Sequence, residues 1–394
     1  MEEAVIVSAA RTPIGRFGGG FVDMPAADLG AMAIKVALDR AKVSPASVEE
    51  VVFGCCLHVG EDTNIGRRAS VKAGLPVEVP AFTVNRVCGS GLEAINTAAR
   101  FIETGEAQIM VAGGTENMSQ MPYVIRKARW GYRMGDGVIE DTMTTGPLHC
   151  PFNHYHMGVT AENVAARFEI SRQAQDEFSL KSHQKAVAAI KAGRFKDEII
   201  PVSVPQGRGQ PKIVDTDEHP RADSSLERLG QLAPAFKQGG CVTAGNSSGV
   251  NDGAAAVVMM SRSMAKKLNL KPLLVVKARA SAGVDPAIMG MGPLPATQKV
   301  LKRAGLNLSD MDLIELNEAF AAPSLAVGRE LGMDWDKVNV NGGAIALGHP
   351  VGATGAILAV KLAYELQRRG ARYGLATMCI GGGMGIATIF ERPA

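Results

Sequence analysis

The sequence lacks an excess of charge of either sign and lacks long apolar runs. Its 42 Lys and Arg residues nearly balance 39 Asp and Glu residues, which leaves a net charge of +3. This balance argues against a broad nucleic-acid-binding surface without excluding a local site for an anionic ligand. No apolar run approaches the roughly 18 residues of a membrane-spanning helix, and the acidic start MEEAVIV is unlike a basic secretory signal. We therefore expect no membrane segment and a cytoplasmic location.

Paired-cysteine and nucleotide-binding motifs are also missing. The six cysteines form no CxxC motif, which favours reduced thiols over a disulfide framework in a chain of 394 residues. His149, Cys150, His154 and His156 are of metal-binding types, but their spacing matches no common structural zinc site, so we predict no metal. The absence of GxGxxG between a strand and a helix, and of GK[ST], argues against nucleotide-dependent hydride or phosphoryl transfer.

The sequence does contain alternating strand-like and helical patterns, which are typical of an α/β protein. Strand-like runs at 4–9, 51–53 and 109–112 flank helical patterns such as 26–41. Residues 36–51 align with 299–314 at an offset of 263, and both segments predict a helix, a turn and a strand. We therefore predict two duplicated halves related by a pseudo-twofold axis.

The predicted division follows from this repeat and from a change of texture between its copies. An N-terminal half takes residues 1–118 plus 250–271, and a C-terminal half takes 272–394. Between them, 119–249 is an inserted loop domain with one long helical pattern at 171–192. Loops inserted on a rigid scaffold often bind substrate.

Cys88 lies between a strand-like run and a helical pattern, in the sequence NRVCGSG at residues 85–91. The helical pattern has apolar residues spaced by three and four, so Cys88 is expected at a helix start. Free N–H groups and the helix dipole there predict a lowered thiol pKa and a nucleophilic sulfur. From this context alone, a nucleophile and a buried structural cysteine are equally good interpretations.

His349 stands opposite Cys88 in the repeat. The offset pairs residues 88–89 with 351–352, and His349 precedes a predicted helix over 356–367. An imidazole there could accept the proton of a thiol or donate to a developing oxyanion. A hydrogen-bonded turn histidine is the commoner interpretation in isolation, and the position opposite Cys88 favours the catalytic one.

Two further elements could contribute to such a site. Cys379 ends an apolar run and begins the sequence CIGGG at 379–383, which predicts a hairpin with a bare backbone at its tip. Glycines there let a ligand approach and can point N–H groups at an oxyanion. Asn317 follows a strand-like pattern, and its amide could hold a water molecule or a carbonyl.

Together, NRVCGSG at 85–91, NEAF at 317–320, GHP at 348–350 and CIGGG at 379–383 resemble the four signature blocks of the thiolases, in the same order. The resemblance spans nearly the whole chain, beginning with RTPIG at 11–15. It implies the thiolase fold, in which two βαβαβαββ halves form five layers, αβαβα, with the active site between the halves. It also implies a reversible, ping-pong acetyl-CoA C-acetyltransferase reaction. Two acetyl-CoA condense to acetoacetyl-CoA and CoA, or a short-chain 3-ketoacyl-CoA undergoes thiolysis.

The resemblance gives each catalytic position a role. Cys88 carries the acyl group, and Cys379 takes a proton from the α-carbon of the second substrate. His349 activates Cys88 and helps to hold the enolate oxygen, while Asn317 positions a water in that oxyanion hole. The N–H groups of Cys88 and Gly381 hold the thioester oxygen, and one such donor is typically worth about 3 kcal/mol.

The resemblance also places coenzyme A on the inserted segment and its edges. HPR at 219–221 is similar to the stretch whose arginine, here Arg221, lies near the nucleotide. AGNSSG at 244–249 resembles the pantetheine loop, with Ala244 and Ser248 as matched positions. Other matched tunnel positions are Leu148, His156, Met157, Phe236, Met289 and Phe320. Coenzyme A thioesters are substrates here, and no separate cofactor is expected.

Residues 123–133 interleave cations with aromatic side chains, a pattern that can suit single-stranded nucleic acid. The resemblance favours an arm for subunit contacts in a homotetramer. Met157, Met289 and this arm resemble the short-chain, biosynthetic branch, although the residues leave the direction of the reaction and the chain length open.

Two other functions are consistent with a fold of this class. A ketoacyl synthase would be expected to have a second catalytic histidine where Asn317 stands. A noncatalytic lipid- or coenzyme A-binding protein could dispense with Cys88, His349 and Cys379, so their joint presence argues against it.

Overall fold

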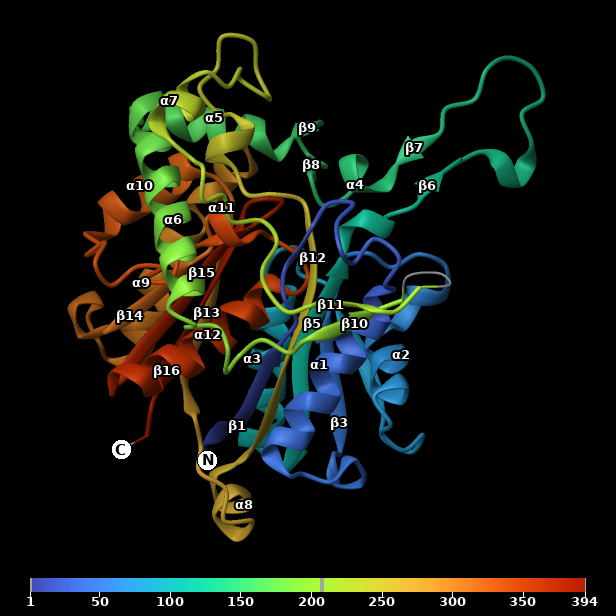
Figure 1. Ribbon diagram of the computed structural model, residues 1–394, viewed down its shortest axis with the longest axis vertical. Coiled ribbons are helices and arrows are strands. Elements are labelled where there is room, and N and C mark those ends of the chain that lie inside the picture. The colour runs from blue at the N-terminus through green and yellow to red at the C-terminus, as the bar shows by residue number, and fades with distance from the viewer. Residues whose placement is uncertain (1, 206–208, 394) are drawn as a thin grey trace.

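A ten-stranded mixed sheet forms the centre of the computed structural model, which describes residues 2–205 and 209–393 (Figure 1). The N-terminal part of this sheet has the order β4-β3-β5-β12-β1. Its members are β1 (Ala4–Arg11), β3 (Glu50–Gly54), β4 (Ala81–Val84), β5 (Ile109–Asn117) and β12 (Asn251–Ser261), with the short β2 (Gly15–Arg16) paired to β12. The predicted strands at 4–9, 51–53 and 109–112 are therefore confirmed.

The C-terminal part of the sheet repeats this arrangement. Its strands are β13 (Leu274–Gly283), β14 (Leu313–Leu316), β15 (Tyr373–Ile380) and β16 (Met384–Glu391), in the order β14-β15-β16-β13. A parallel bridge between Ile314 and Val338 takes the place that β4 has in the first half. In both halves the parallel strand pairs lie at the outer edge of the sheet and the antiparallel pairs lie toward its middle. The predicted duplication is therefore confirmed.

The two half-sheets are joined where β1 meets β13. Only two residue pairs connect these strands, Val5 with Val275 and Ile6 with Leu274. Each half therefore has its own extensively hydrogen-bonded half-sheet, and the two halves pack against each other mainly through helices.

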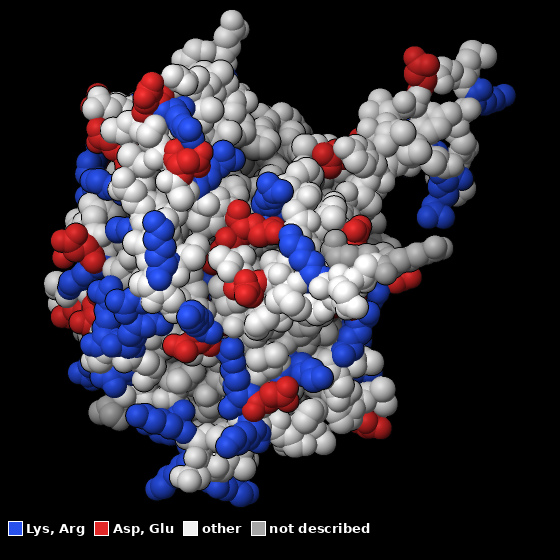
Figure 2. Space-filling view, viewed as in Figure 1, with Lys and Arg blue, Asp and Glu red and all other residues white. Residues whose placement is uncertain are grey.

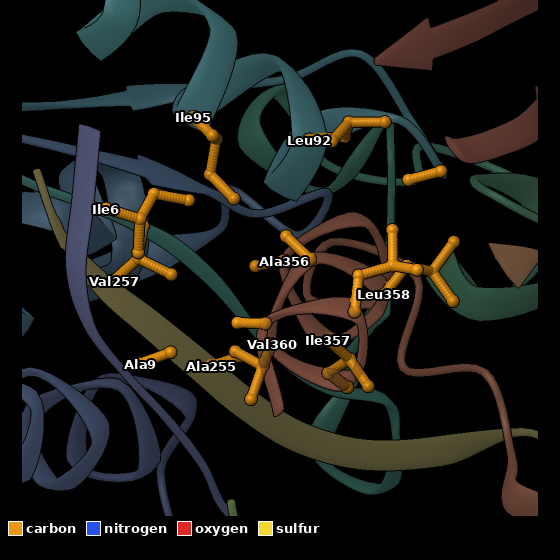
Figure 3. Packing of buried hydrophobic residues seen from close by; sticks show 14 of the residues in the cluster. Ile6, Ala9, Leu92, Ile95, Ala255, Val257, Ala356, Ile357, Leu358 and Val360 are labelled. Atoms are coloured by element: carbon orange, nitrogen blue, oxygen red, sulfur yellow. The ribbon is translucent and has the colours of Figure 1, made fainter. Parts of the chain in front are cut away.

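Helices complete the five layers. α1 (Ala26–Ala41) and α2 (Ile65–Lys72) cover the outer face of the first half-sheet, and α9 (Pro293–Ala304) and α10 (Ala321–Leu331) cover that of the second. α3 (Ser90–Thr104) and α12 (Thr354–Arg369) lie between the sheets. Figure 3 shows this central layer, where Leu92 and Ile95 of α3 and Ala356 and Val360 of α12 pack with Ile6 and Val257 in one buried cluster.

Glycines let the two central helices approach to backbone contact. Gly91 and Gly355 are each the second residue of their helix. A Cβ on Gly91 would lie 2.7 Å from the backbone nitrogen of Ala356, and one on Gly355 would overlap the backbone of Leu92. No larger residue fits either position without moving a helix.

The segment between β5 and β12 leaves and re-enters the sheet at neighbouring positions, since Asn117 pairs with Asp252. It contains a two-stranded arm of β6 (Tyr123–Val124) and β7 (Glu140–Asp141), then α4 (Thr142–Thr145), β8 (His149–Cys150), β9 (Tyr155–His156) and α5 (Met157–Arg167). The predicted helix at 171–192 is α6 (Arg172–Lys191), and Ser171 caps it by accepting from the N–H of Ala174. β10 (Val202–Val204), β11 (Lys212–Val214) and α7 (Leu226–Gly230) follow, while α8 (Arg262–Lys267) and α11 (Ala344–Leu347) lie outside the segment.

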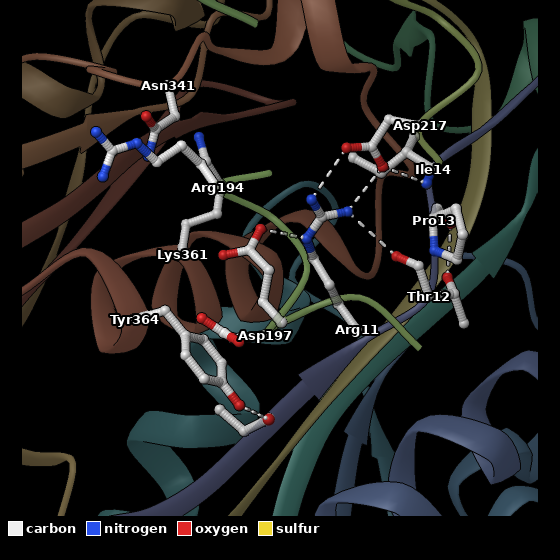
Figure 4. Close-up of polar contacts among 12 residues, drawn as sticks. Arg11, Thr12, Pro13, Ile14, Arg194, Asp197, Asp217, Asn341, Lys361 and Tyr364 are labelled. Atoms are coloured by element: carbon white, nitrogen blue, oxygen red, sulfur yellow. Dashed lines mark hydrogen bonds and ion pairs between the residues drawn. The ribbon is translucent and has the colours of Figure 1, made fainter. Parts of the chain in front are cut away.

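A buried arginine ties this segment to the first sheet. Arg11, at the end of β1, donates from Nε to Glu198 at 2.8 Å and from its two terminal nitrogens to Asp217 at 2.7 and 3.0 Å (Figure 4). Asp217 also accepts from the N–H of Ile14. Burial disfavours the guanidinium charge, but the two carboxylates outweigh it and raise the pKa of Arg11 above its ordinary value. The triad fixes residues 198 and 217 beside the sheet, and with them the loop that leads to Arg221.

Within the described ranges, every helix is too short or too polar to cross a lipid bilayer.

We predict that Gly355→Ala lowers the free energy of unfolding by about 1–3 kcal/mol, because the added methyl group overlaps the backbone of α3. Gly230→Ala is the matched control, since Gly230 is exposed and no atom lies within 4 Å of its built Cβ. We expect that control to be neutral or to stabilise by up to about 1 kcal/mol. Urea unfolding followed by circular dichroism measures both. Equal midpoints for the wild type and Gly355→Ala would contradict the helix contact.

Candidate active site

Cys88 lies in a tight turn just before α3. Ser90 Oγ accepts from the N–H of Arg86 at 2.9 Å and donates to the carbonyl of Val87 at 2.6 Å, which closes the turn. Val87 has φ of 45°, a left-handed conformation that is strained for a β-branched residue. The side chain of Asn85 accepts from the N–H of Val87 and helps to hold it there. Strain of this kind is often found next to reactive side chains.

The pKa of Cys88 differs from the expectation. Burial raises the pKa of the Cys88 thiol to about 11. The N–H groups of Gly381 and of Cys88 itself lower this pKa in part, and Glu116 raises it slightly. The predicted lowering at the helix start is therefore wrong for the free protein, because desolvation outweighs the N–H groups. Cys88 is a thiol at neutral pH until a base removes its proton.

Cys379 lies at the end of β15, opposite Gly385 of β16, and is buried. Burial raises the pKa of its thiol well above the ordinary value, and the nearby Cys88 raises it further. The predicted hairpin follows directly, with Gly382 and Gly383 at φ of 84° and 87° in its turn. This turn presents the N–H of Gly381 to the sulfur of Cys88.

His349 follows α11 and is held on two sides. Its backbone N–H donates to the side chain of Asn251 at 2.9 Å, and its Nδ1 lies 2.6 Å from Oγ1 of Thr354. The Thr354 hydroxyl donates its one hydrogen to the carbonyl of Pro350 at 2.9 Å, so Nδ1 carries the imidazole proton and donates to Thr354. Nε2 is therefore the basic, unprotonated nitrogen. Burial lowers the pKa of His349 to about 4, which keeps it neutral at pH 7.

Asn317 extends from the end of β14 toward His349, with Nδ2 at 3.5 Å from Nε2. Among the residues that the structure describes, none makes a hydrogen bond to its buried Oδ1. The next residue, Glu318, anchors the strand end by accepting from Ser182, Asn339 and the N–H of Ile345. A buried acceptor without a protein partner fits a water molecule or a substrate group.

The other predicted positions lie around this centre or beside it. Met157, Met289 and Phe320 pack in one buried cluster with Cys379, and Phe236 stacks on His156 with ring centroids 4.6 Å apart. Leu148 and Cys88 pack against the same buried cluster of Met118, Met121 and Val351, and Ser248 donates its N–H to the carbonyl of Ala319. Arg221 and Ala244 line a separate cavity with His183, His219 and Arg228.

The four residues weighed as zinc ligands form no metal-binding group. In residues 2–205 and 209–393, no set of three or more His, Cys, Asp or Glu side chains is arranged to hold an ion.

Comparison with known proteins agrees with this geometry. The description "Thiolase, N-terminal domain" matches residues 4–263 and "Thiolase, C-terminal domain" matches 270–392. The chain belongs to the thiolase family. It is 54% identical over 391 residues to an acetyl-CoA acetyltransferase of Chromobacterium violaceum. The alignment covers 99% of this chain and 100% of the relative.

Solved thiolase structures share its fold. A Bacillus anthracis acetyl-CoA acetyltransferase superposes with a TM-score of 0.98 at 45% identity, over 100% of this chain and 99% of the other. A human mitochondrial 3-ketoacyl-CoA thiolase in complex with CoA gives 0.96 at 45% identity, over 100% and 98%. The predicted thiolase fold is confirmed.

Sequence reasoning missed the residues that hold this thiolase site together. Glu116, buried at the end of β5, accepts from the N–H groups of Cys56 and Leu57 in the first half and of Gly352 in the second. Asn251 and Thr354 orient His349. Thr354 has a local signal, because it stands five residues after His349 at a helix start. Glu116 and Asn251 have none, because their partners are distant in sequence.

The buried His349 predicts a loss of stability in acid. Its pKa is about 4 in the folded chain and about 6.5 when it is unperturbed, so between these values the unfolded chain binds a proton that the folded chain excludes. The free energy of unfolding should fall as the pH falls from 6.5 to 4, by up to about 3 kcal/mol from this residue. Burial also lowers the pKa values of His183 and His219 to about 4, and they act in the same window.

Urea unfolding at pH 7 and pH 5 tests this. His349→Asn should lose less stability than the wild type between the two values, whereas His154→Asn, at an exposed position, should lose as much. A pH dependence that His349→Asn leaves unchanged would contradict the assignment.

Proposed function

We propose that the protein is an acetyl-CoA C-acetyltransferase that joins two acetyl-CoA to acetoacetyl-CoA and CoA, or splits short 3-ketoacyl-CoA, by a ping-pong mechanism. One observation carries the proposal. The partly buried Cys88 lies close enough to the buried Cys379 for the two thiols to interact electrostatically, and the buried His349 is a neutral imidazole with Nε2 as its basic nitrogen. A single acyl-transfer site needs one such thiol, and a second is suited to moving a proton on carbon.

In the first half-reaction, His349 Nε2 takes the proton of Cys88 as its sulfur attacks the thioester carbonyl. The C–S bond to coenzyme A then breaks, and free coenzyme A leaves with that proton. The N–H groups of Cys88 and Gly381 stabilise the negative oxygen of the tetrahedral intermediate. Because the pKa of the thiol is about 11 and that of the imidazole about 4, both groups are neutral at pH 7. The proton therefore moves only as the new bond forms.

In the second half-reaction, His349 Nε2 first takes the thiol proton of Cys379, and the resulting thiolate takes a proton from the α-carbon of acetyl-CoA. That carbon attacks the acyl group on Cys88, so a new C–C bond forms and the C–S bond to Cys88 breaks. His349 then gives its proton to the sulfur of Cys88, which leaves both cysteines as thiols. His349 and a water on Asn317 would hold the enolate oxygen. Burial raises the pKa of the Cys379 thiol, and the nearby Cys88 raises it further, so Cys379 needs His349 as a base before it can take a proton from carbon.

The inserted segment would bind coenzyme A. Its outer cavity is lined by Arg221 and by Arg228, which pairs with Asp223 in the same lining, so a net positive charge remains there, and Ala244 belongs to the same cavity wall. We place the nucleotide there and the pantetheine along Ser248 toward Phe236, Phe320 and the two cysteines. Leu148, His156, Met157 and Met289 complete the tunnel. The solved human thiolase in complex with CoA supports coenzyme A as the ligand class.

The proposed domain division and location rest on the same observations. The neighbouring exit and entry points at Asn117 and Asp252 support 119–249 as an insertion, with 1–118 plus 250–271 and 272–394 as the two halves. All six cysteines are free thiols, which supports a reducing compartment such as the cytoplasm.

The protein should acquire one acetyl group on Cys88 when it is mixed with excess acetyl-CoA, because the first half-reaction stops there until an enolate forms. Intact-mass measurement and peptide mapping detect the group. Cys379→Ala should be acetylated but should lose at least about a hundredfold in condensation rate, since the base is gone. Cys88→Ser keeps a similar shape and is the matched control, in which labelling should be lost.

Two results would sink the proposal. One is an acetyl group that persists in Cys88→Ala. The other is a wild-type protein that forms no acetyl-CoA from acetoacetyl-CoA and CoA.

A homotetramer, arranged as a dimer of dimers, would explain two surfaces. The arm of β6 and β7 projects from the body and carries charged side chains beside uncharged ones (Figure 2), with Trp130 exposed by 88% and Met134 by 96%. The cation Arg126 already pairs with Glu140, which leaves less charge for a nucleic acid. At the sheet edge, β4 has one unpaired side, where another subunit could add a strand.

Met134→Asp should therefore convert tetramers to dimers, because a charge would be buried in the contact between arms. Light scattering after size exclusion measures the mass. Leu268→Asp is the matched control, since Leu268 is exposed by 44% next to α8, at the opposite end of the molecule (Figure 1). If Met134→Asp and Leu268→Asp have the same mass as the wild type, the arm is not the contact.

A further inference from the structure

A second cavity lies outside the proposed catalytic site, between α6, α10 and residues 335–339. Its volume is about 200 Å³. This is below the roughly 300–1,000 Å³ of sites for drug-sized ligands, so it suits a smaller molecule. The lining includes Phe178, Lys181 and Lys185 of α6, Leu325 of α10, Trp335, and Glu318 on the floor.

One wall of this cavity is apolar and aromatic. Phe178 and Trp335 meet edge to face, with ring centroids 5.3 Å apart and planes at 72°. Leu325 of α10 continues the wall, and all three side chains are half-buried. Partly exposed aromatic rings in a concave surface are typical of ligand sites, because covering them removes apolar area from water.

The α6 side of the cavity carries two lysines at helical spacing, Lys181 and Lys185. Lys185 donates from Nζ to the carbonyls of Trp335 at 3.2 Å and Val338 at 3.0 Å, so one of its three donors is left. Lys181 is exposed at the rim and takes part in none of the ion pairs formed by the described residues. Both cations can therefore accept an anionic partner.

The two carboxylates in the lining have donors already. Glu318, on the floor, accepts from Ser182 at 2.6 Å, from Asn339 at 2.8 Å and from the N–H of Ile345 at 3.2 Å. Glu177, at the rim, accepts from Gln173 at 2.9 Å. The formal charges of the lining therefore balance, but the oxygens of Glu318 already accept from neutral donors, whereas Lys181 has no ion-pair partner among the described residues and Lys185 keeps one donor unused.

We propose that this cavity binds a small carboxylate with an apolar or aromatic body. The body packs on Phe178, Leu325 and Trp335, and the carboxylate lies between Lys181 and Lys185. A neutral analogue of the same shape would leave the lysines unpaired, and an amine would have to pair with Glu177 at the rim instead.

Occupancy of the cavity is coupled to the proposed coenzyme A site through α6. Ser182 faces the cavity, and the next residue, His183, lines the outer nucleotide cavity and accepts from the N–H of Arg221 at 3.2 Å. On the floor, Glu318 directly follows Asn317. This coupling rests on the proposed function, whereas the cavity's own ligand does not.

Trp335 reports binding directly, because the chain has only one other tryptophan, Trp130. In a Trp130→Phe background, 3-phenylpropionate should change the fluorescence of Trp335 with a saturable dependence on concentration. Lys181→Gln should weaken binding by about fivefold, as expected for one partly exposed charge contact. Glu177→Gln is the matched control, which removes an opposite charge one turn away and should leave the affinity equal or higher.

Three results would overturn the site. They are a fluorescence that does not saturate, equal binding of the neutral 3-phenylpropan-1-ol, and weaker binding in Glu177→Gln, which would indicate a ligand with a positive group. Calorimetry of CoA binding with and without saturating 3-phenylpropionate then tests the coupling. An affinity for CoA that does not change overturns the coupling, and since the fluorescence titration needs no catalysis, its outcome is independent of whether the protein is a thiolase.

Discussion

The contact between α3 and α12 is the constraint on which the active site depends. α3 begins two residues after Cys88 and α12 begins five residues after His349, so the distance between their first turns helps to set the distance between these two proposed catalytic residues. Gly91 and Gly355 remove every side-chain atom from that crossing. The loop before α12 approaches as closely, since a Cβ on Gly352 would lie 2.7 Å from both Cys55 and Glu116. A buried helix pair with ordinary side chains at its crossing would hold the axes 8–10 Å apart, a spacing set by those side chains.

Buried carboxylates hold in place the loops and element ends that the glycines allow to approach one another. Glu116 ties the loop of His349 to the first half, Glu318 ties the end of β14 to α6 and α11, and the pair around Arg11 ties the inserted segment to β1. Each carboxylate accepts several hydrogen bonds, which offsets the cost of burying its charge. These anchors use backbone N–H groups or single side chains from distant segments. They orient loops that have little secondary structure of their own.

Much of the fold could be predicted from the sequence, because its determinants are local or repeated. The helix over 26–41 and the helix within 171–192 each follow from a continuous helical pattern, and the repeat at an offset of 263 residues predicts the two halves. The candidate site could be predicted as a set of ordered motifs. Its electrostatics could not, since the thiol pKa of Cys88 depends on burial that a helix-start argument does not contain. Glu116 and Asn251 were missed for the same reason, because their partners become neighbours only in the folded chain.

The adjacent exit and entry of the inserted segment have an evolutionary consequence. Asn117 and Asp252 are paired across two neighbouring strands, so the sheet already holds the ends of the insertion together. Lengthening or shortening it changes the entropy of loop closure only slowly with length. The inserted segment, which would select the acyl group, can therefore diverge between lineages, while the sheet and helix ends that carry the two cysteines stay the same.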